Sequence, residues 1–201
     1  MSASKNIVIG ITGGVATGKS TVAALLRKDF KYFTSADEIA RRIVRPGTPA
    51  YKKIVKAFGK HILTKDGSIN RKILAALIFN NSAKRRLLQN ITHPEIILTL
   101  KKEIKAFKKK SKTVFFEAPL LFEAGMQKMA DIIVVTASSK KNQIKRFIKK
   151  GHTGADALRR IKNQLSLKEK IKKADIVIYN NGSLKELKKS VKNFSTLIKK
   201  F

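Results

Sequence analysis

The distribution of apolar residues along the chain predicts five strands. Apolar runs cover Asn6 to Thr12, Tyr32 to Ser35, Thr113 to Ala118, Asp131 to Thr136 and Asp175 to Tyr179. All but the second are nearly continuous, which is typical of strands that helices cover on both faces. The pattern therefore predicts an α/β fold with a parallel sheet.

Helical patterns fill the intervals between these runs. Asn70 is a candidate N-cap for a helix over Arg71 to Phe79, and Ser183 is one for a C-terminal helix with an apolar face. We also expect a helix that starts at Pro94 and runs toward Lys110, because proline is well tolerated in the first helical turn.

The second and third predicted strands lie far apart in the chain. No convincing strand occurs between Ala36 and Lys112. This interval is too long for a simple crossover between neighbouring strands. We therefore expect one domain with a core at residues 1–35 and 112–201 and a helical insertion at residues 36–111 that holds a second substrate.

A shorter irregular segment, Lys149 to Ala155, contains two glycines between basic helices. We interpret it, with its flanks, as a mobile lid over about residues 146–160. Cations near such a lid stabilise the γ-phosphate when a kinase site closes. The candidates here are Arg146, Lys149, Lys150, Arg159 and Arg160.

The composition is strongly basic. The 201 residues carry a net charge of +32, from 45 Lys and Arg against 13 Asp and Glu. The lysines are dispersed along helices, and arginine is much the scarcer of the two. We therefore attribute the charge to a lysine-rich composition and to attraction of an anionic small molecule, and we expect no nucleic-acid partner.

Other features of the composition narrow the class of protein. No apolar run is long enough to span a bilayer, and the N-terminus has no charged-then-apolar leader. Cysteine is absent and there are 3 histidines, which argues against disulfides and a zinc site. We expect a cytoplasmic protein with no membrane association.

The segment Gly13 to Ser20 carries the most specific chemistry. It fits the pattern G-x-x-x-x-G-K-[ST] and lies between a predicted strand and a predicted helix. Glycines let such a loop curl around phosphates, Lys19 would reach the β- and γ-phosphates from a solvent-facing position, and the Ser20 hydroxyl would ligate Mg²⁺. ATP and Mg²⁺ are thus the predicted cofactors. The expected nucleotide-binding residues are Gly13, Gly14, Val15, Ala16, Thr17, Gly18, Lys19, Ser20 and Thr21.

Two acids lie at the carboxyl ends of predicted strands, at the edge of a parallel sheet where ligands bind. Asp37 could orient or deprotonate a hydroxyl for attack on a phosphoryl group, or it could cap the helix from Glu38 to Val44. The local sequence leaves both roles open. Glu117 is a candidate contact for Mg²⁺, and the alternative is a solvated carboxylate at a strand end.

The segment Pro119-Leu120-Leu121-Phe122-Glu123 follows the second acid. Its large apolar residues could belong to the core, or they could form a wall for an adenine or a pantetheine arm.

These motifs together resemble the dephospho-CoA kinase family over nearly the whole chain. The P-L-L-F-E segment and the A-D-x-V-I-x-N-x-G ending are much more specific than the glycine loop, which many kinases share. The resemblance rests on Gly10 to Thr21, Ala36 to Arg41, Pro46-Gly47, Arg71 to Phe79, His93-Pro94, Pro119 to Glu123, Arg160-Ile161 before Gln164, and Ala174 to Ile178 before Asn180 and Gly182.

The resemblance implies a P-loop nucleotide-kinase fold with a five-stranded parallel sheet. It also implies ATP-dependent phosphorylation of the ribose 3′-hydroxyl of dephospho-CoA, with Asp37 as the catalytic carboxylate and the lid near Arg146. With the resemblance, the expected catalytic residues are Asp37, Lys19 and Arg146. The expected substrate-binding residues are Asp37, Arg41, His93, Pro119, Leu120 and Leu121, and the metal contacts are Ser20 and Glu117.

The chain departs from the family's usual pattern at two positions. Ser35 stands where the family usually has the first acid of D-A-D, although Asp37 keeps the second. Lys149 stands where the family tends to have a second arginine, and lysine keeps the charge but loses the bidentate fork.

Two other functions share part of this pattern. A nucleoside monophosphate kinase would have the same loop, sheet and lid, but it would not need a base at Asp37. A basic nucleic-acid-binding P-loop NTPase would use the charge but would leave the P-L-L-F-E segment unexplained. We predict a monomer or small homo-oligomer whose partner is the small molecule dephospho-CoA.

Overall fold

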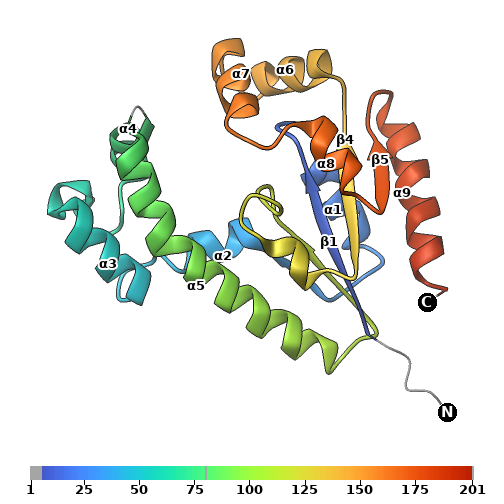
Figure 1. Ribbon diagram of the computed structural model, residues 1–201, viewed down its shortest axis with the longest axis horizontal. Coiled ribbons are helices and arrows are strands. Elements are labelled where there is room, and N and C mark those ends of the chain that lie inside the picture. Colours follow the sequence, from blue (N-terminus) through green and yellow to red (C-terminus); the bar gives the residue numbers. More distant parts are fainter. Residues whose placement is uncertain (1–5, 80, 201) are drawn as a thin grey trace. The chain divides into compact units, whose positions relative to one another are not determined.

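A computed structural model describes residues 6–79 and 81–200 and contains a five-stranded sheet in the order β2-β3-β1-β4-β5 (Figure 1). The pairs β1–β3, β1–β4 and β4–β5 are parallel. The predicted α/β fold is confirmed, and every predicted strand lies within one residue of its expected bounds. The strands are β1 (Ile7–Gly13), β2 (Phe33–Ser35), β3 (Thr113–Glu117), β4 (Ile132–Ala137) and β5 (Ile176–Tyr179).

Helices connect the strands along the chain, and a further helix follows the last strand. In the described ranges, no helix is both long and apolar enough to cross a membrane. The α-helices are α1 (Lys19–Leu26), α2 (Ala36–Arg42), α3 (Pro49–Phe58), α4 (Arg71–Phe79), α5 (Ser82–Lys108), α6 (Lys140–Lys149), α7 (Gly154–Lys162), α8 (Leu167–Lys172) and α9 (Leu184–Ile198). Two 3₁₀ helices are η1 (Lys60–Ile62) and η2 (Met126–Met129).

The chain divides into two compact units. The core unit comprises Met1–Thr34 and Ile104–Phe201, as far as the structure describes them, and the insertion unit is Ser35–Glu103. The boundary on the C-terminal side falls inside α5, earlier than the end of the insertion expected from the sequence, because this helix continues from one unit into the other.

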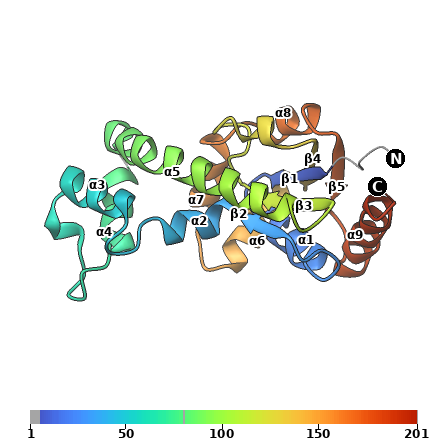
Figure 2. The same cartoon turned by 90° about the horizontal axis from the view of Figure 1, so that it is seen from below.

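Both faces of the sheet in the core unit are covered, as continuous apolar strands require. Ile9 and Ile11 of β1 belong to a core with buried residues of α1 and α9. On the opposite face, a Cβ at Gly10 would lie 3.0 Å from both Leu121 and Phe116, so glycine permits this close packing. Figure 2 shows α1 and α8 on opposite faces of the sheet.

Two aspartates at the starts of strands join neighbouring strands in the sheet. Asp131 precedes β4 and accepts a hydrogen bond from Val8 N at 2.8 Å. Asp175 precedes β5 and accepts one from Ile133 N at 2.7 Å. Each carboxylate thus satisfies a backbone donor that the parallel ladder does not reach.

Side-chain caps fix several helix starts as the sequence predicts. Asn70 Oδ1 accepts hydrogen bonds from Lys72 N and Ile73 N at the start of α4. Ser183 and Glu186 form a capping box at the start of α9.

The predicted helix start at Pro94 is wrong, because this residue lies inside α5. The helix begins twelve residues earlier in the chain, where Asn81 Oδ1 accepts a hydrogen bond from Lys84 N at 2.9 Å. A proline inside a helix removes one backbone hydrogen bond. Apolar residues on both sides of it pack well enough to keep the helix continuous, with Leu88 and Ile91 before it and Ile96 and Leu100 after it.

The insertion unit has a small apolar core of its own. Ile54, Phe58, Ile62 and Leu74 are buried there, and partly buried residues of the same unit surround them. The single β-bridge outside the sheet, Leu63 with Ile69, also lies in this unit within the described residues.

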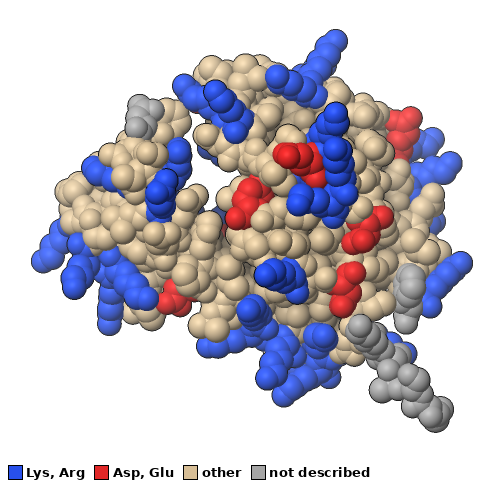
Figure 3. Space-filling model, in the orientation of Figure 1, with Lys and Arg blue, Asp and Glu red and all other residues tan. Residues whose placement is uncertain are grey.

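The basic residues are spread over the surface. On the face drawn in Figure 3, Lys and Arg side chains occur over many elements and do not form one continuous patch, and acidic side chains are few. This view agrees with the dispersed pattern seen in the sequence.

Candidate functional site: a phosphate loop with fixed cations

The glycine loop connects the end of β1 to the start of α1. Gly18 has φ 99°, in the left-handed region that favours glycine. A Cβ at this position would also clash with the side-chain amide nitrogen of Asn180. Within the loop, the Thr17 hydroxyl donates a hydrogen bond to Gly14 O at 3.0 Å. The loop therefore has the backbone shape that a phosphate cradle requires.

Lys19 is not solvent-facing, so this part of the prediction is wrong. The residue is 8% exposed, and its Nζ lies 3.4 Å from Glu117 Oε1 at the end of β3. The solvated-carboxylate reading of Glu117 is also wrong, since this residue is 9% exposed. The carboxylate compensates the buried ammonium and holds it at the loop.

Arg146 lies in the last turn of α6, and its guanidinium is held by four hydrogen bonds. It donates to Thr17 O at 3.4 Å, to Ser138 Oγ at 3.2 Å, and to Asn180 O and Oδ1 at 2.9 and 3.2 Å. Two of its partners lie on the glycine loop and at the end of β5. The charge is thus fixed beside the loop.

Asn180 was not among the predicted site residues. It follows β5 and is 8% exposed, and its Nδ2 donates to Thr17 O at 2.8 Å. A buried amide at the carboxyl end of a parallel strand, in the motif A-D-x-V-I-x-N-x-G, was the sequence feature that could have identified it.

A pocket of about 450 Å³ opens beside the loop in the core unit. Basic and apolar side chains share its walls, which suits a molecule with both phosphates and an apolar ring system. Its lining residues are Ala16, Gly18, Thr21, Arg146, Lys149, Lys150, Asn180, Gly182, Leu184 and Leu187.

The predicted lid is mostly helical. Residues 150–153 alone separate α6 from α7, so the irregular segment is shorter than the sequence suggested. The rings of Phe147 and His152 stack with centroids 4.3 Å apart, and Arg160 lies over the Phe147 ring at 5.4 Å. Lys149 and Lys150 are exposed and line the pocket beside the loop.

The Pro119–Glu123 segment is anchored by a buried lysine that the sequence did not single out. Lys170 of α8 is 0% exposed, and its Nζ lies 2.9 Å from Glu123 Oε1 and 2.9 Å from Pro119 O. Thr12 Oγ1 also donates to Pro119 O, at 3.3 Å. Leu121 is fully buried, which is the core role that the sequence allowed, whereas Pro119 and Leu120 are partly exposed.

The remaining predicted residues belong to the insertion unit. Ser35, not Asp37, is the N-cap of α2, and its Oγ accepts a hydrogen bond from Glu38 N at 3.4 Å. The capping interpretation of Asp37 is therefore wrong. Asp37 and Arg41 are both exposed and lie four residues apart, on one face of this helix.

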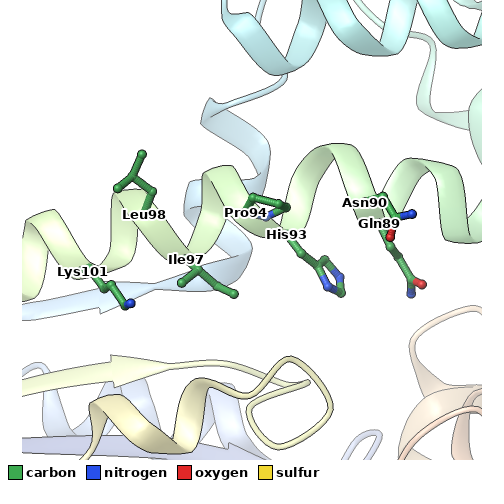
Figure 4. A pocket seen from close by; sticks show the side chains of 7 residues that line it. All are labelled: Gln89, Asn90, His93, Pro94, Ile97, Leu98 and Lys101. Atoms are coloured by element: carbon green, nitrogen blue, oxygen red, sulfur yellow. The ribbon is translucent and has the colours of Figure 1, made fainter.

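His93 lines a pocket of about 560 Å³ along α5 (Figure 4). The view shows His93, Ile97 and Lys101 on the same side of the helix, as their spacing of four residues requires. Partial burial lowers the pKa of His93 below its ordinary value, so the imidazole is neutral at pH 7. The other lining residues are Gln89, Asn90, Pro94 and Leu98.

The oxygen donors near the loop fit Mg²⁺. The exposed hydroxyl of Ser20 and the carboxylate of Glu117 are hard ligands of the kind that this ion prefers. In the part of the chain that the structure describes, no three His, Cys, Asp or Glu residues form a metal cluster. A magnesium ion held by two protein oxygens and by substrate phosphates needs no such cluster.

Comparisons with known proteins show which family the chain belongs to. The family model described as dephospho-CoA kinase matches residues 7–186. A dephospho-CoA kinase of Carboxydothermus hydrogenoformans is 41% identical over 92% of this chain and 90% of its own length. One of Fusobacterium nucleatum is 42% identical over 96% of this chain and 98% of its own. The solved structure of a dephospho-CoA kinase from Campylobacter jejuni superposes with a TM-score of 0.74 at 30% identity and covers 98% of both chains.

Proposed function

The chain belongs to the dephospho-CoA kinase family, and we propose that it transfers the γ-phosphoryl group of ATP to the ribose 3′-hydroxyl of dephospho-CoA. The products are coenzyme A and ADP. The observation that carries this proposal is the glycine loop with two cations fixed beside it, Lys19 and Arg146. Charge that develops on the transferred group would meet donors that are already in place.

The residues of the loop have separate tasks in this proposal. Residues Gly13 to Thr21 bind the phosphates, with loop backbone N–H groups as donors, and the N-terminus of α1 adds positive potential. Lys19 contacts the γ-phosphoryl group, and Arg146 stabilises the charge that accumulates in the transition state. The pocket beside the loop takes the adenosine.

Asp37 is the group that we assign to the acceptor. Its exposed carboxylate, in the first turn of α2, orients the 3′-hydroxyl and accepts its proton as the oxygen attacks the γ-phosphorus. Arg41, one turn further along, contacts an anionic group of the same substrate. The replacement of the family's first acid by Ser35 keeps the helix cap and leaves this task to Asp37.

We assign the arm of dephospho-CoA to apolar surface. The α5 pocket, with His93 and Ile97, offers an apolar face with a neutral imidazole. Pro119 and Leu120 offer a second apolar contact, and Leu121 supports them from the core.

Mg²⁺ is the expected metal, held by Ser20 and Glu117. When bound, it would neutralise charge on the β- and γ-phosphate oxygens. Glu117 also balances Lys19, so its carboxylate serves both cations.

A comparison of acceptors, each assayed separately, tests the proposed function. ADP formation from ATP would be measured with dephospho-CoA, AMP, CMP, UMP and an RNA oligomer as separate acceptors. We expect turnover only with dephospho-CoA, and a preference for a monophosphate or RNA would refute the assignment.

We also propose that the protein is cytoplasmic and is a monomer or small homo-oligomer, which cell fractionation and light scattering would test.

A further inference from the structure

Asn180 connects three elements at the phosphate site. Its Nδ2 donates to Thr17 O of the glycine loop at 2.8 Å, and its Oδ1 accepts from Arg146 at 3.2 Å. Its backbone carbonyl accepts from Arg146 at 2.9 Å and from Ser138 Oγ, after β4, at 2.8 Å. One residue thus holds the loop, α6 and the end of β4 together.

The two side-chain bonds fix the orientation of the amide. In the reverse orientation, the amide oxygen would face the Thr17 carbonyl and the NH₂ group would face the guanidinium of Arg146. Neither contact would be a hydrogen bond, because each would join two acceptors or two donors. Gly18 completes the fit, since any Cβ there would clash with Asn180 Nδ2.

The bond to Thr17 O also determines the direction of a phosphate donor. In a planar trans peptide, the carbonyl of Thr17 and the N–H of Gly18 point in opposite directions. Holding the carbonyl toward Asn180 therefore aims the Gly18 N–H away from Asn180, on the opposite side of the backbone. The same side chain also holds Arg146, whose charge the reaction uses.

We propose that Asn180 is a positioning residue for phosphoryl transfer, which fixes the Thr17–Gly18 peptide and the Arg146 guanidinium toward the nucleotide phosphates. The proposal rests on the proposed kinase function. The proposal gives Asn180 no contact with the acceptor. Substitutions at Asn180 should therefore change the binding and reaction of ATP and not the binding of dephospho-CoA.

The neighbouring residue supplies a matched control. Asn181 is exposed, and its Oδ1 accepts from Ser139 N at 2.7 Å and from Ser138 Oγ at 3.2 Å. Asn181→Asp keeps both of these acceptor bonds. The same change at position 180 removes the donor to Thr17 O and places a carboxylate against this carbonyl. Both variants add one negative charge near the loop, so the comparison separates charge from positioning.

The test measures ATP affinity by calorimetry without the acceptor, and then kcat and both KM values. For Asn180→Asp and Asn180→Ala we expect ATP affinity to fall about 10-fold or more and kcat to fall about 10-fold or more, because small displacements of catalytic groups have such effects. The KM for dephospho-CoA should change less than about 2-fold, and Asn181→Asp should resemble wild type in every constant.

Three results would overturn the proposal: wild-type ATP affinity in folded Asn180 variants, an equal loss in Asn181→Asp, or a lower melting temperature with unchanged constants. If Asn180→Asp does not fold, the ATP affinity and kcat of Asn180→Ala test the proposal. A wild-type protein that binds ATP but ignores dephospho-CoA would refute the proposed function instead, because the affinity comparison does not use the acceptor.

Discussion

The two units present their functional residues in opposite ways. In the core unit, Lys19, Glu117 and Asn180 are all buried. Lys19 pairs with Glu117, and Asn180 donates to Thr17 O of the glycine loop. In the insertion unit, Asp37 and Arg41 are exposed on a short helix. A triphosphate site gains from donors that are fixed before binding, because their reorganisation would otherwise oppose the reaction. Asp37 and Arg41, which we assign to the acceptor, are instead exposed to water.

The comparison also concerns stability. The residues that we assign to the site in the core unit lie beside a sheet whose central strands are covered by apolar packing, so we expect their loss to disturb both packing and chemistry. The insertion unit has a smaller core, and its candidate catalytic residue lies outside it. We therefore expect substitutions near the loop to change activity and stability together, and substitutions at Asp37 to change activity alone.

Lys19→Ala should have the largest effect. It removes the cation that we assign to the γ-phosphoryl group, and we expect kcat to fall by about 10³-fold or more. It also leaves the buried Glu117 carboxylate without the ammonium beside it, which should lower the free energy of unfolding by about 1–3 kcal/mol. Turnover and denaturant unfolding measure the two effects.

A double variant separates these effects. Lys19→Met with Glu117→Gln removes both charges from the site, so much of the lost stability should return while activity stays absent. Near-normal turnover in either variant would contradict the role of the glycine loop.

Glu123→Gln should have the next largest effect. We expect it to lower the free energy of unfolding by about 3 kcal/mol. It leaves the ammonium of Lys170 fully buried with Pro119 O and a neutral amide. Lys170→Met should be milder, because the carboxylate it leaves behind is 23% exposed and can be hydrated. If Lys170→Met were the more damaging of the two, packing of the lysine stem would outweigh the charge.

Asp37→Asn should lower kcat by about 10²-fold, equivalent to roughly 2.7 kcal/mol of barrier, without changing the melting temperature. Asparagine keeps the size and hydrogen bonding of the side chain but cannot take the proton. The KM for ATP should hardly move. The control is Ser35→Ala, which removes the α2 cap, should lower stability by about 1 kcal/mol and should retain activity. An active Asp37→Asn enzyme would transfer the catalytic role to another group or to no protein base.

Much of the fold followed from local patterns. The buried strands are continuous apolar runs, and the cap residues at Asn70 and Ser183 stand directly before their helices. The prediction of a helix start at Pro94 was wrong because a proline can also lie inside a helix when packing on both sides compensates for the missing hydrogen bond. Ser35 and Asp37 could not be separated as caps, since both residue types serve that role and they are two positions apart.

The site was only partly predictable, because its arrangement depends on contacts distant in sequence. The glycine loop has a local motif, but Lys19 meets a carboxylate almost one hundred residues away. Asn180 and Lys170 act through bonds to Thr17 and Glu123, which no local spacing reveals. The sequence gives the residue types at positions 170 and 180, but it does not show that both side chains are buried.

The smallest effect that we predict concerns His93 and pH. Burial lowers its pKa in the folded protein, whereas the unfolded chain has the ordinary value of 6.5. The unfolded state therefore binds more protons as the pH falls through 6.5, and the folded protein loses stability in that range. The loss should be smaller than the about 1 kcal/mol expected for Ser35→Ala, because the side chain is only partly buried. His93→Gln should flatten this part of the stability profile, and His61 and His152 are common to both proteins and cancel in the difference. Equal slopes between pH 7 and pH 5 in the two proteins would show that the α5 pocket does not hold a neutral imidazole.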